Sequence, residues 1–177
     1  MHNAGRGQSP APTEIKRMNS SMPQRRRIRL PRQAYGIRGQ IFSVTVCCSD
    51  GQSHLDDESL SGAIQEALAG GTLCGHARLF AFALMPDHVH LLAEIGDLNL
   101  IDAIARWKSY TTTLFRRVGG VGPLWQRSFY DHGIRTPEDL VVAAAYIVDN
   151  PKRAGLPGRG KYAWSTWSPA RPVPCSR

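Results

Sequence analysis

Two histidines separated by a single residue are the clearest candidates for chemistry in this chain. His88 and His90 lie in an apolar run that follows a Pro86-Asp87 turn. In an extended strand alternate side chains share a face, so both imidazoles point the same way, about 7 Å apart along the strand. Imidazoles are common metal ligands, and such a pair can converge on one ion. Taken alone, the pattern fits two half-exposed polar residues on a sheet better than a metal site.

A tyrosine and an amide form a second candidate constellation, near the end of a predicted helix. Thr136 is a good N-cap, a proline follows at the first helical position, and Asp139 completes a capping-box pattern. We expect this helix to stop before Pro151, because proline biases the preceding residue away from helical angles. Tyr146 and Asn150 are one turn apart and therefore share one side of the helix.

The elements that must position these residues predict an α+β fold. Alternating and continuous apolar runs predict strands over 40–48, 79–85, 88–95 and 129–135. Helical periodicity predicts helices over 56–68, over 98–117 and from 137 onward. The order β-α-β-β-α-β-α is typical of an antiparallel β-sheet with packed helices, a ferredoxin-like plait. We expect the histidine pair on an interior strand of that sheet.

The length of 177 residues suits one domain with tails. Residues 1–24 are rich in Gly, Ser, Pro and Asn with few apolar anchors, and we expect this segment to be disordered. The domain is expected over 25–156. A Gly- and Pro-rich C-terminal tail follows over 157–177, docked in part through Trp164 and Trp167.

The cellular setting expected from composition is the cytoplasm. No apolar run approaches the roughly 20 residues of a membrane span, so no membrane partner is expected. The four cysteines show no C-x-x-C pairing, which argues against a disulfide framework or a zinc knuckle.

Positive charge is concentrated at the start of the chain. Residues 1–40 contain nine Lys or Arg and one Glu, a net charge of +8 that equals the charge of the whole chain. Such an arm is typical of a protein with a polyanionic partner, although solvated arginine-rich extensions also occur. Candidate DNA contacts in the arm are Arg25, Arg26, Arg27 and Arg29. Further candidates are Arg106 and Lys108 on the 98–117 helix, and Arg127 after it.

Three ordered motifs together resemble a known family. They are the strand-borne His88-Val-His90, the block Trp125-Gln126-x-x-Phe129-Tyr130-Asp131-His132-x-x-Arg135, and the helix end Tyr146-Ile-Val-Asp-Asn150-Pro151-x-x-Ala154-Gly155-Leu156. This arrangement resembles the single-tyrosine HUH transposases of bacterial insertion sequences, and most closely the REP-associated tyrosine transposases. The resemblance covers roughly residues 29–167.

The resemblance implies a metal-dependent endonuclease and strand transferase for single-stranded DNA. By this resemblance His88 and His90 bind the metal, Asn150 supplies a third ligand, and Tyr146 is the nucleophile that forms a 5′-phosphotyrosine. The implied cofactor is Mg²⁺ or Mn²⁺, although imidazole ligands alone favour zinc, copper or iron. The implied partner is single-stranded DNA with a REP-like or element-end hairpin. The implied protein is a monomer or homodimer in the bacterial cytoplasm, at the nucleoid.

Two alternative functions are compatible with parts of the pattern. A DNA-binding protein that keeps the fold without catalysis would not need His88, His90 and Tyr146. A zinc hydrolase would need a third strong ligand, and the chain has neither an H-x-H-x-D-H nor an H-E-x-x-H motif. Among the other aromatic residues, Tyr130 is expected in the core, and Trp125 is expected there in preference to a role in stacking on a base.

Overall fold

The computed structural model describes residues 32–166 and is built around one antiparallel β-sheet. The strands lie in the order β2 (Thr72–Leu73), β3 (Ala77–Leu84), β4 (His88–Ile95), β1 (Ile41–Cys47) and β5 (Tyr130–Ile134), and β6 (Ala163–Ser165) pairs with β3. The α-helices are α1 (Glu58–Ala69), α2 (Leu100–Arg117) and α3 (Pro137–Arg153). The expected α+β class is confirmed, and the histidine pair lies on the interior strand β4.

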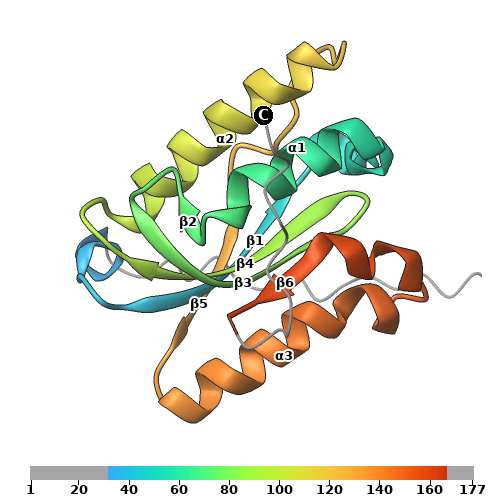
Figure 1. The fold of residues 1–177 in the computed structure, drawn as a ribbon. Coiled ribbons are helices and arrows are strands. Elements are labelled where there is room, and N and C mark those ends of the chain that lie inside the picture. Colours follow the sequence, from blue (N-terminus) through green and yellow to red (C-terminus); the bar gives the residue numbers. More distant parts are fainter. Residues whose placement is uncertain (1–31, 167–177) are drawn as a thin grey trace, which may run out of the picture.

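Helices α1 and α2 cover one face of the sheet, above it in Figure 1. Alternation along β4 turns its odd-numbered residues toward these helices, where they are buried. The apolar stripes of the two helices face them, as their spacing predicts. The resulting core includes Val89, Leu91 and Ile95 from β4, Leu60, Ile64 and Leu68 from α1, and Leu100, Ile104 and Trp107 from α2.

Helix α3 lies on the opposite face of the sheet (Figure 1). Ala144 and Ile147 are buried there with Leu92 of β4 and Ala83 of β3, in a second, smaller apolar cluster. Leu92 shares its strand face with His88 and His90, because the three residues are spaced by two. The helix that carries Tyr146 therefore packs on the same face of the sheet as the two imidazoles.

The expectation that α3 stops before Pro151 is wrong. The helix runs to Arg153 with Pro151 inside its last turn. The amide of Ala154 donates to the Asn150 carbonyl at 2.9 Å, and that of Leu156 donates to the Pro151 carbonyl at 2.8 Å. Pro151 is buried, so tertiary packing and these closing bonds outweigh the local bias that a proline places on the residue before it.

The segment after α3 returns to the sheet. A 3-10 helix, Pro157–Tyr162, leads into β6, where Trp164 is buried against Phe82 with ring centroids 5.9 Å apart. Arg159 donates to the Leu84 carbonyl at 3.2 Å and to the Leu55 carbonyl at 2.6 Å. These bonds hold the 3-10 helix that follows α3 beside the last residue of β3. Trp167 lies outside the described residues.

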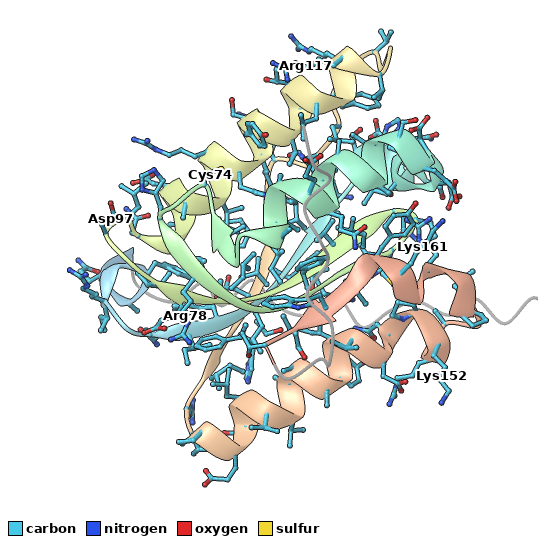
Figure 2. All side chains as sticks on the ribbon, viewed as in Figure 1. Cys74, Arg78, Asp97, Arg117, Lys152 and Lys161 are labelled. Carbon is cyan, nitrogen blue, oxygen red and sulfur yellow. The ribbon has the colours of Figure 1, made fainter. Side chains whose placement is uncertain are left out.

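Helices α2 and α3 end in basic residues on opposite sides of the molecule. Arg117 closes α2, and Lys152 lies in the last turn of α3 (Figure 2). Within residues 32–166 no helix has the length and apolar character to cross a membrane.

Candidate active site

The imidazoles of His88 and His90 converge on one point. Their Nε2 atoms lie 3.0 Å apart, and their ring planes meet nearly edge to face at 87°. Two ligands at right angles, each about 2.1 Å from a shared ion, lie about 3.0 Å apart. The strand therefore holds the two Nε2 atoms at the distance expected between neighbouring ligands of one metal ion.

Each imidazole is oriented by a hydrogen bond at its other nitrogen. Nδ1 of His88 lies 2.6 Å from the Asp87 carboxylate, and Nδ1 of His90 lies 3.0 Å from the Thr45 hydroxyl on β1. When Nδ1 carries the proton, Nε2 keeps its lone pair for a metal. Such partners at the far nitrogen are typical of histidines that bind metal ions.

His90 is held in the neutral form that a ligand needs. Burial, followed by the charge of a protonated His88, lowers the pKa of His90 to about 4, and Asp87 opposes the shift only in part. At neutral pH the His90 imidazole is therefore uncharged. A proton does not compete with a metal ion for Nε2 until the solution is acidic.

Further ligands would be of another chemical kind. The described residues hold no group of three or more His, Cys, Asp or Glu arranged to bind a metal. Asn150 lies on α3, half-buried, and its side-chain amide nitrogen is buried without a hydrogen-bond partner. An unpaired buried N–H donor is costly and calls for an acceptor such as a phosphate oxygen, whereas the side-chain oxygen is the atom of Asn150 that could bind a metal. The donor set fits a divalent ion that also takes oxygen atoms from phosphate and water.

Tyr146 lies one turn before Asn150 and is accessible. Its side chain is 51% exposed on α3. The Arg153 guanidinium lies over its ring, 4.8 Å from the centroid. Guanidinium groups pair readily with phosphate oxygens, so a phosphate drawn to Arg153 would lie beside the phenol.

The predicted basic contacts fall in different places. Arg106 lies near His76 on the outer side of α2, with 3.4 Å between the guanidinium and Nε2. Lys108 is half-buried and donates to the carbonyls of Gln126 at 2.8 Å and Ser128 at 2.9 Å, and burial lowers its pKa to about 8. Lys108 thus fastens the segment before β5 to α2. The arm residues Arg25, Arg26, Arg27 and Arg29 lie outside the described residues.

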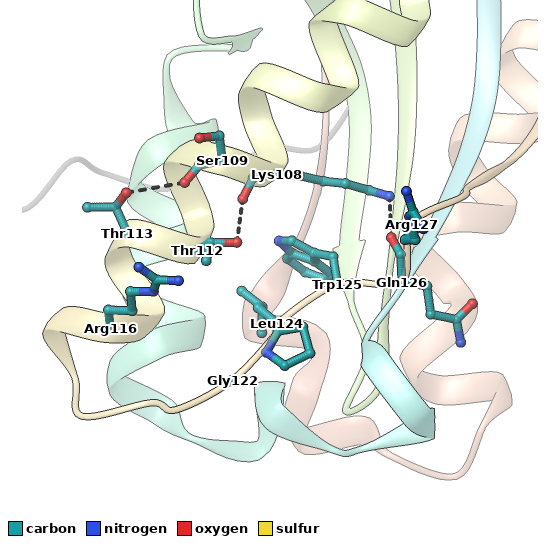
Figure 3. A pocket seen from close by; sticks show the side chains of 11 residues that line it. Lys108, Ser109, Thr112, Thr113, Arg116, Gly122, Leu124, Trp125, Gln126 and Arg127 are labelled. Carbon is teal, nitrogen blue, oxygen red and sulfur yellow. Dashed lines mark hydrogen bonds between the residues drawn. The ribbon is translucent and has the colours of Figure 1, made fainter.

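A cleft of about 560 Å³ lies between α2 and the segment 122–127 (Figure 3). Arg116 on α2 and Arg127 on the segment line it from opposite sides, together with the hydroxyls of Thr112 and Thr113. Every charged residue among its lining residues is basic. Arg127 thus belongs to a concave basic surface, on the layer opposite α3.

Two aromatic residues of the 125–135 motif, Trp125 and Tyr130, differ in burial. Trp125 is buried against Trp107 and donates through Nε1 to the Thr111 hydroxyl at 2.8 Å, so its expected core placement is confirmed. The expected core placement of Tyr130 is wrong, because its side chain is 63% exposed. The sequence signal for Tyr130 is ambiguous, since Phe129 and Tyr130 are adjacent and only one of them can face inward from a strand.

The comparisons with known proteins point to one family of transposases. The family described as "Transposase IS200 like" matches residues 40–150. A Haemophilus influenzae protein of undescribed function is 24% identical over 165 residues, which cover 75% of this chain and 91% of that protein. A second protein of that organism, provisionally named a REP-associated tyrosine transposase, is 32% identical over 87 residues, covering 42% of this chain and 49% of its own length.

A solved structure shares the fold. It is described as a REP-associated tyrosine transposase bound to a REP hairpin. It aligns with 69% of this chain and 72% of its own chain, at a TM-score of 0.52 and 23% sequence identity.

Proposed function

The chain belongs to the IS200-like transposase family, and on that premise we propose that it cleaves and rejoins single-stranded DNA near hairpins through a covalent tyrosine intermediate. The observation that carries the proposal is the convergence of the His88 and His90 Nε2 atoms to 3.0 Å, on the face of the sheet that α3 covers. A protein that only binds DNA has no need of two oriented imidazoles with converging Nε2 atoms, nor of an accessible tyrosine on the helix that packs on the same face of the sheet.

Tyr146 is the proposed nucleophile. Its phenol oxygen forms a bond to phosphorus, the bond between phosphorus and the 3′ oxygen breaks, and the phenolic proton passes to solvent while the 3′ oxygen gains one. The protein is then joined to the 5′-phosphate. Because the phosphotyrosine retains the energy of the broken bond, a 3′-hydroxyl of another strand can reverse the step without ATP.

His88, His90 and Asn150 are the proposed metal ligands, with Mg²⁺ or Mn²⁺ as the ion. These residues would hold the ion, and the chemistry that it would supply is polarisation of the scissile phosphate and stabilisation of the charge that develops on it. Asp87 and Thr45 hold the two imidazoles with Nε2 directed at the ion site. Arg153 places a positive charge next to the Tyr146 ring, where it can help to orient the phosphate.

The proposed partner is single-stranded DNA with a hairpin, and the proposed location is the bacterial cytoplasm, at the nucleoid. Support comes from the solved structure with the same fold, which is described as bound to a REP hairpin. The basic arm, Arg106 and Arg127 are the proposed contacts to the DNA backbone, and Lys108 is left out of them because its ammonium group is bonded to the carbonyls of Gln126 and Ser128. A monomer and a homodimer are both compatible with this chemistry.

The test is to trap the covalent adduct. Wild-type protein, Mg²⁺ and single-stranded DNA from beside the gene should give a protein–DNA species that survives denaturation. Tyr146→Phe keeps the ring and removes the attacking oxygen, so this variant should bind the DNA with near wild-type affinity and give no adduct.

Other functions give other outcomes. A metal hydrolase that activates water would still cleave the DNA in the Tyr146→Phe variant and would never form an adduct. A non-catalytic DNA-binding protein would leave the DNA intact in both forms. An adduct that persists in Tyr146→Phe and is absent in Tyr110→Phe would mean that the nucleophile lies on α2.

A further inference from the structure

Part of the sheet face that carries the histidines is left uncovered by α3. The strand register aligns His90 of β4 with Thr45 of β1, and Thr45 with Tyr130 of β5. Directly paired residues of an antiparallel sheet present their side chains on the same face. Since the Thr45 hydroxyl contacts His90, all three side chains lie in one row across three strands. They are on the face of the sheet that carries His88 and His90, called the metal face below.

The orientation of Tyr130 is fixed by its neighbour. The Asp131 carboxylate accepts hydrogen bonds from the Tyr35 hydroxyl at 3.2 and 3.1 Å, and Tyr35 is buried in the core on the other face of the sheet. Alternation along β5 therefore directs Tyr130 and His132 to the metal face. With 63% of its surface exposed, the Tyr130 side chain contributes little to the core.

Position and charge both suit a nucleic-acid strand. Two strand spacings separate Tyr130 from His90, about 10 Å between backbones, so a nucleotide near the phosphate at the histidines lies within reach of the ring. Arg135 is exposed and directly follows β5, whereas Arg127, before β5, lines the cleft on the other side of the sheet. The acid of β5, Asp131, is turned away and engaged by Tyr35. A polyanion therefore meets no acidic side chain of β5 on this face, and the exposed ring favours a flat aromatic group.

We propose that Tyr130 is a stacking platform for an unpaired base of the DNA strand whose phosphate is cleaved at the histidine site. An aromatic side chain on an open sheet face stacks on a base with little dependence on sequence. The inference rests on the proposed function for the position of the phosphate. The ring, and not the hydroxyl, makes the contact.

The experiment measures binding in the Tyr146→Phe background, where no cleavage interferes. Adding Tyr130→Ala should weaken binding of the single-stranded target by about 5- to 150-fold, and adding Tyr130→Phe should leave it nearly unchanged. Tyr110→Ala is the control: Tyr110 is also exposed, at 46%, but lies on α2 in the opposite layer, so any weakening it causes should persist with every abasic target described below.

A set of targets with one abasic site each then identifies the stacked base. At one position, near the cleaved phosphodiester, removal of the base leaves nothing to stack on the ring. The target that lacks this base should therefore bind the Tyr146→Phe protein and the protein that also carries Tyr130→Ala with the same weak affinity. At other positions the weakening caused by Tyr130→Ala should persist. The proposed function is tested separately, by adduct formation in protein that retains Tyr146. If the adduct forms but no abasic position removes the Tyr130→Ala effect, the stacking inference fails and the proposed function stands.

Three results would overturn the inference. One is a Tyr110→Ala effect that the same abasic position removes. Another is weakening by Tyr130→Ala that is the same for every abasic target. The same holds if the weakening coincides with a change from dimer to monomer in sedimentation, because this face would then be a subunit contact. The third is absence of the covalent adduct when Tyr130→Phe is made in protein that retains Tyr146, which would make Tyr130 a reacting group.

Discussion

At the scale of single residues, the histidine pair depends on partners that the local sequence does not announce. Asp87 precedes His88 directly, but Thr45 reaches His90 only because β1 and β4 pair in register. The His-x-His motif and period-2 geometry predict that the two rings share a face. They cannot predict which hydroxyl or carboxylate fixes each tautomer, since that is decided by strand register.

Thr45 provides a prediction for metal affinity. Thr45→Val keeps the shape of the side chain and removes the hydroxyl, so His90 Nδ1 loses its partner and the ring is free to change tautomer. Removal of such a partner typically weakens metal binding about 10- to 100-fold. Titration of Mn²⁺ by calorimetry should show this weakening, with unfolding nearly unchanged.

Two further variants bracket the Thr45 prediction. Thr45→Ser retains a hydroxyl and should recover most of the affinity, whereas His90→Ala removes a ligand and should abolish binding at this site. Wild-type Mn²⁺ affinity in Thr45→Val would show that the hydroxyl does not orient His90.

At the scale of elements, most boundaries could be predicted from the sequence and the exceptions have tertiary causes. Strand β4 begins and ends where the alternation predicts, and Thr136 caps α3 by accepting from the Asp139 amide at 3.1 Å. The continuation of α3 through Pro151 could not be predicted, because the burial of Pro151 depends on the returning segment 157–165. The three-residue strand β6 and the two-residue β2 are too short to give a periodic signal.

The candidate site shows the same division. Residues on one element, such as His88 with His90 or Tyr146 with Asn150, could be paired from spacing alone. The placement of α3 on the histidine face could not, because periodicity shows that a helix has an apolar side without showing which face of a sheet receives it. Spacing alone places Lys108 on the basic face of α2, yet its ammonium group is bonded to two loop carbonyls.

A pair of glycines tests how tightly the elements pack. A methyl group at Gly62, within α1, would meet no atom within 4 Å, whereas at Gly96, after β4, it would overlap the backbone carbonyl of His76. Gly62→Ala should raise the free energy of unfolding by about 0.5–1 kcal/mol, because alanine loses less backbone entropy in a helix. Gly96→Ala should lower it by about 1–3 kcal/mol, the usual cost of overpacking.

Urea denaturation measures both glycine variants, with unchanged m-values as the check that the unfolding reaction is the same. A neutral or stabilising Gly96→Ala would contradict the close approach of the loop before β3 to the end of β4.

At the scale of the whole molecule, basic and acidic side chains are distributed unevenly even where the net charge is zero. Residues 41–177 carry equal numbers of acidic and basic side chains, yet residues 103–130 contain five Lys or Arg and no Asp or Glu. This stretch forms most of α2 and the wall of the cleft in Figure 3. The molecule therefore has a basic surface along α2 and the cleft on one side of the sheet and the histidine site on the other side, in addition to the basic arm.

The arm provides the prediction that depends on the whole charge distribution. Neutralising Arg25, Arg26, Arg27 and Arg29 together should weaken DNA binding and flatten its salt dependence, since the log–log slope falls by about 0.7 for each single-strand phosphate that the protein no longer neutralises. Deleting residues 1–24 removes three basic residues and one acid, and should have the smaller effect. Binding measured between about 50 and 200 mM salt, a range over which such slopes are resolved, tests both. An unchanged slope in the four-arginine variant would mean that α2 and the cleft, rather than the arm, neutralise the DNA backbone.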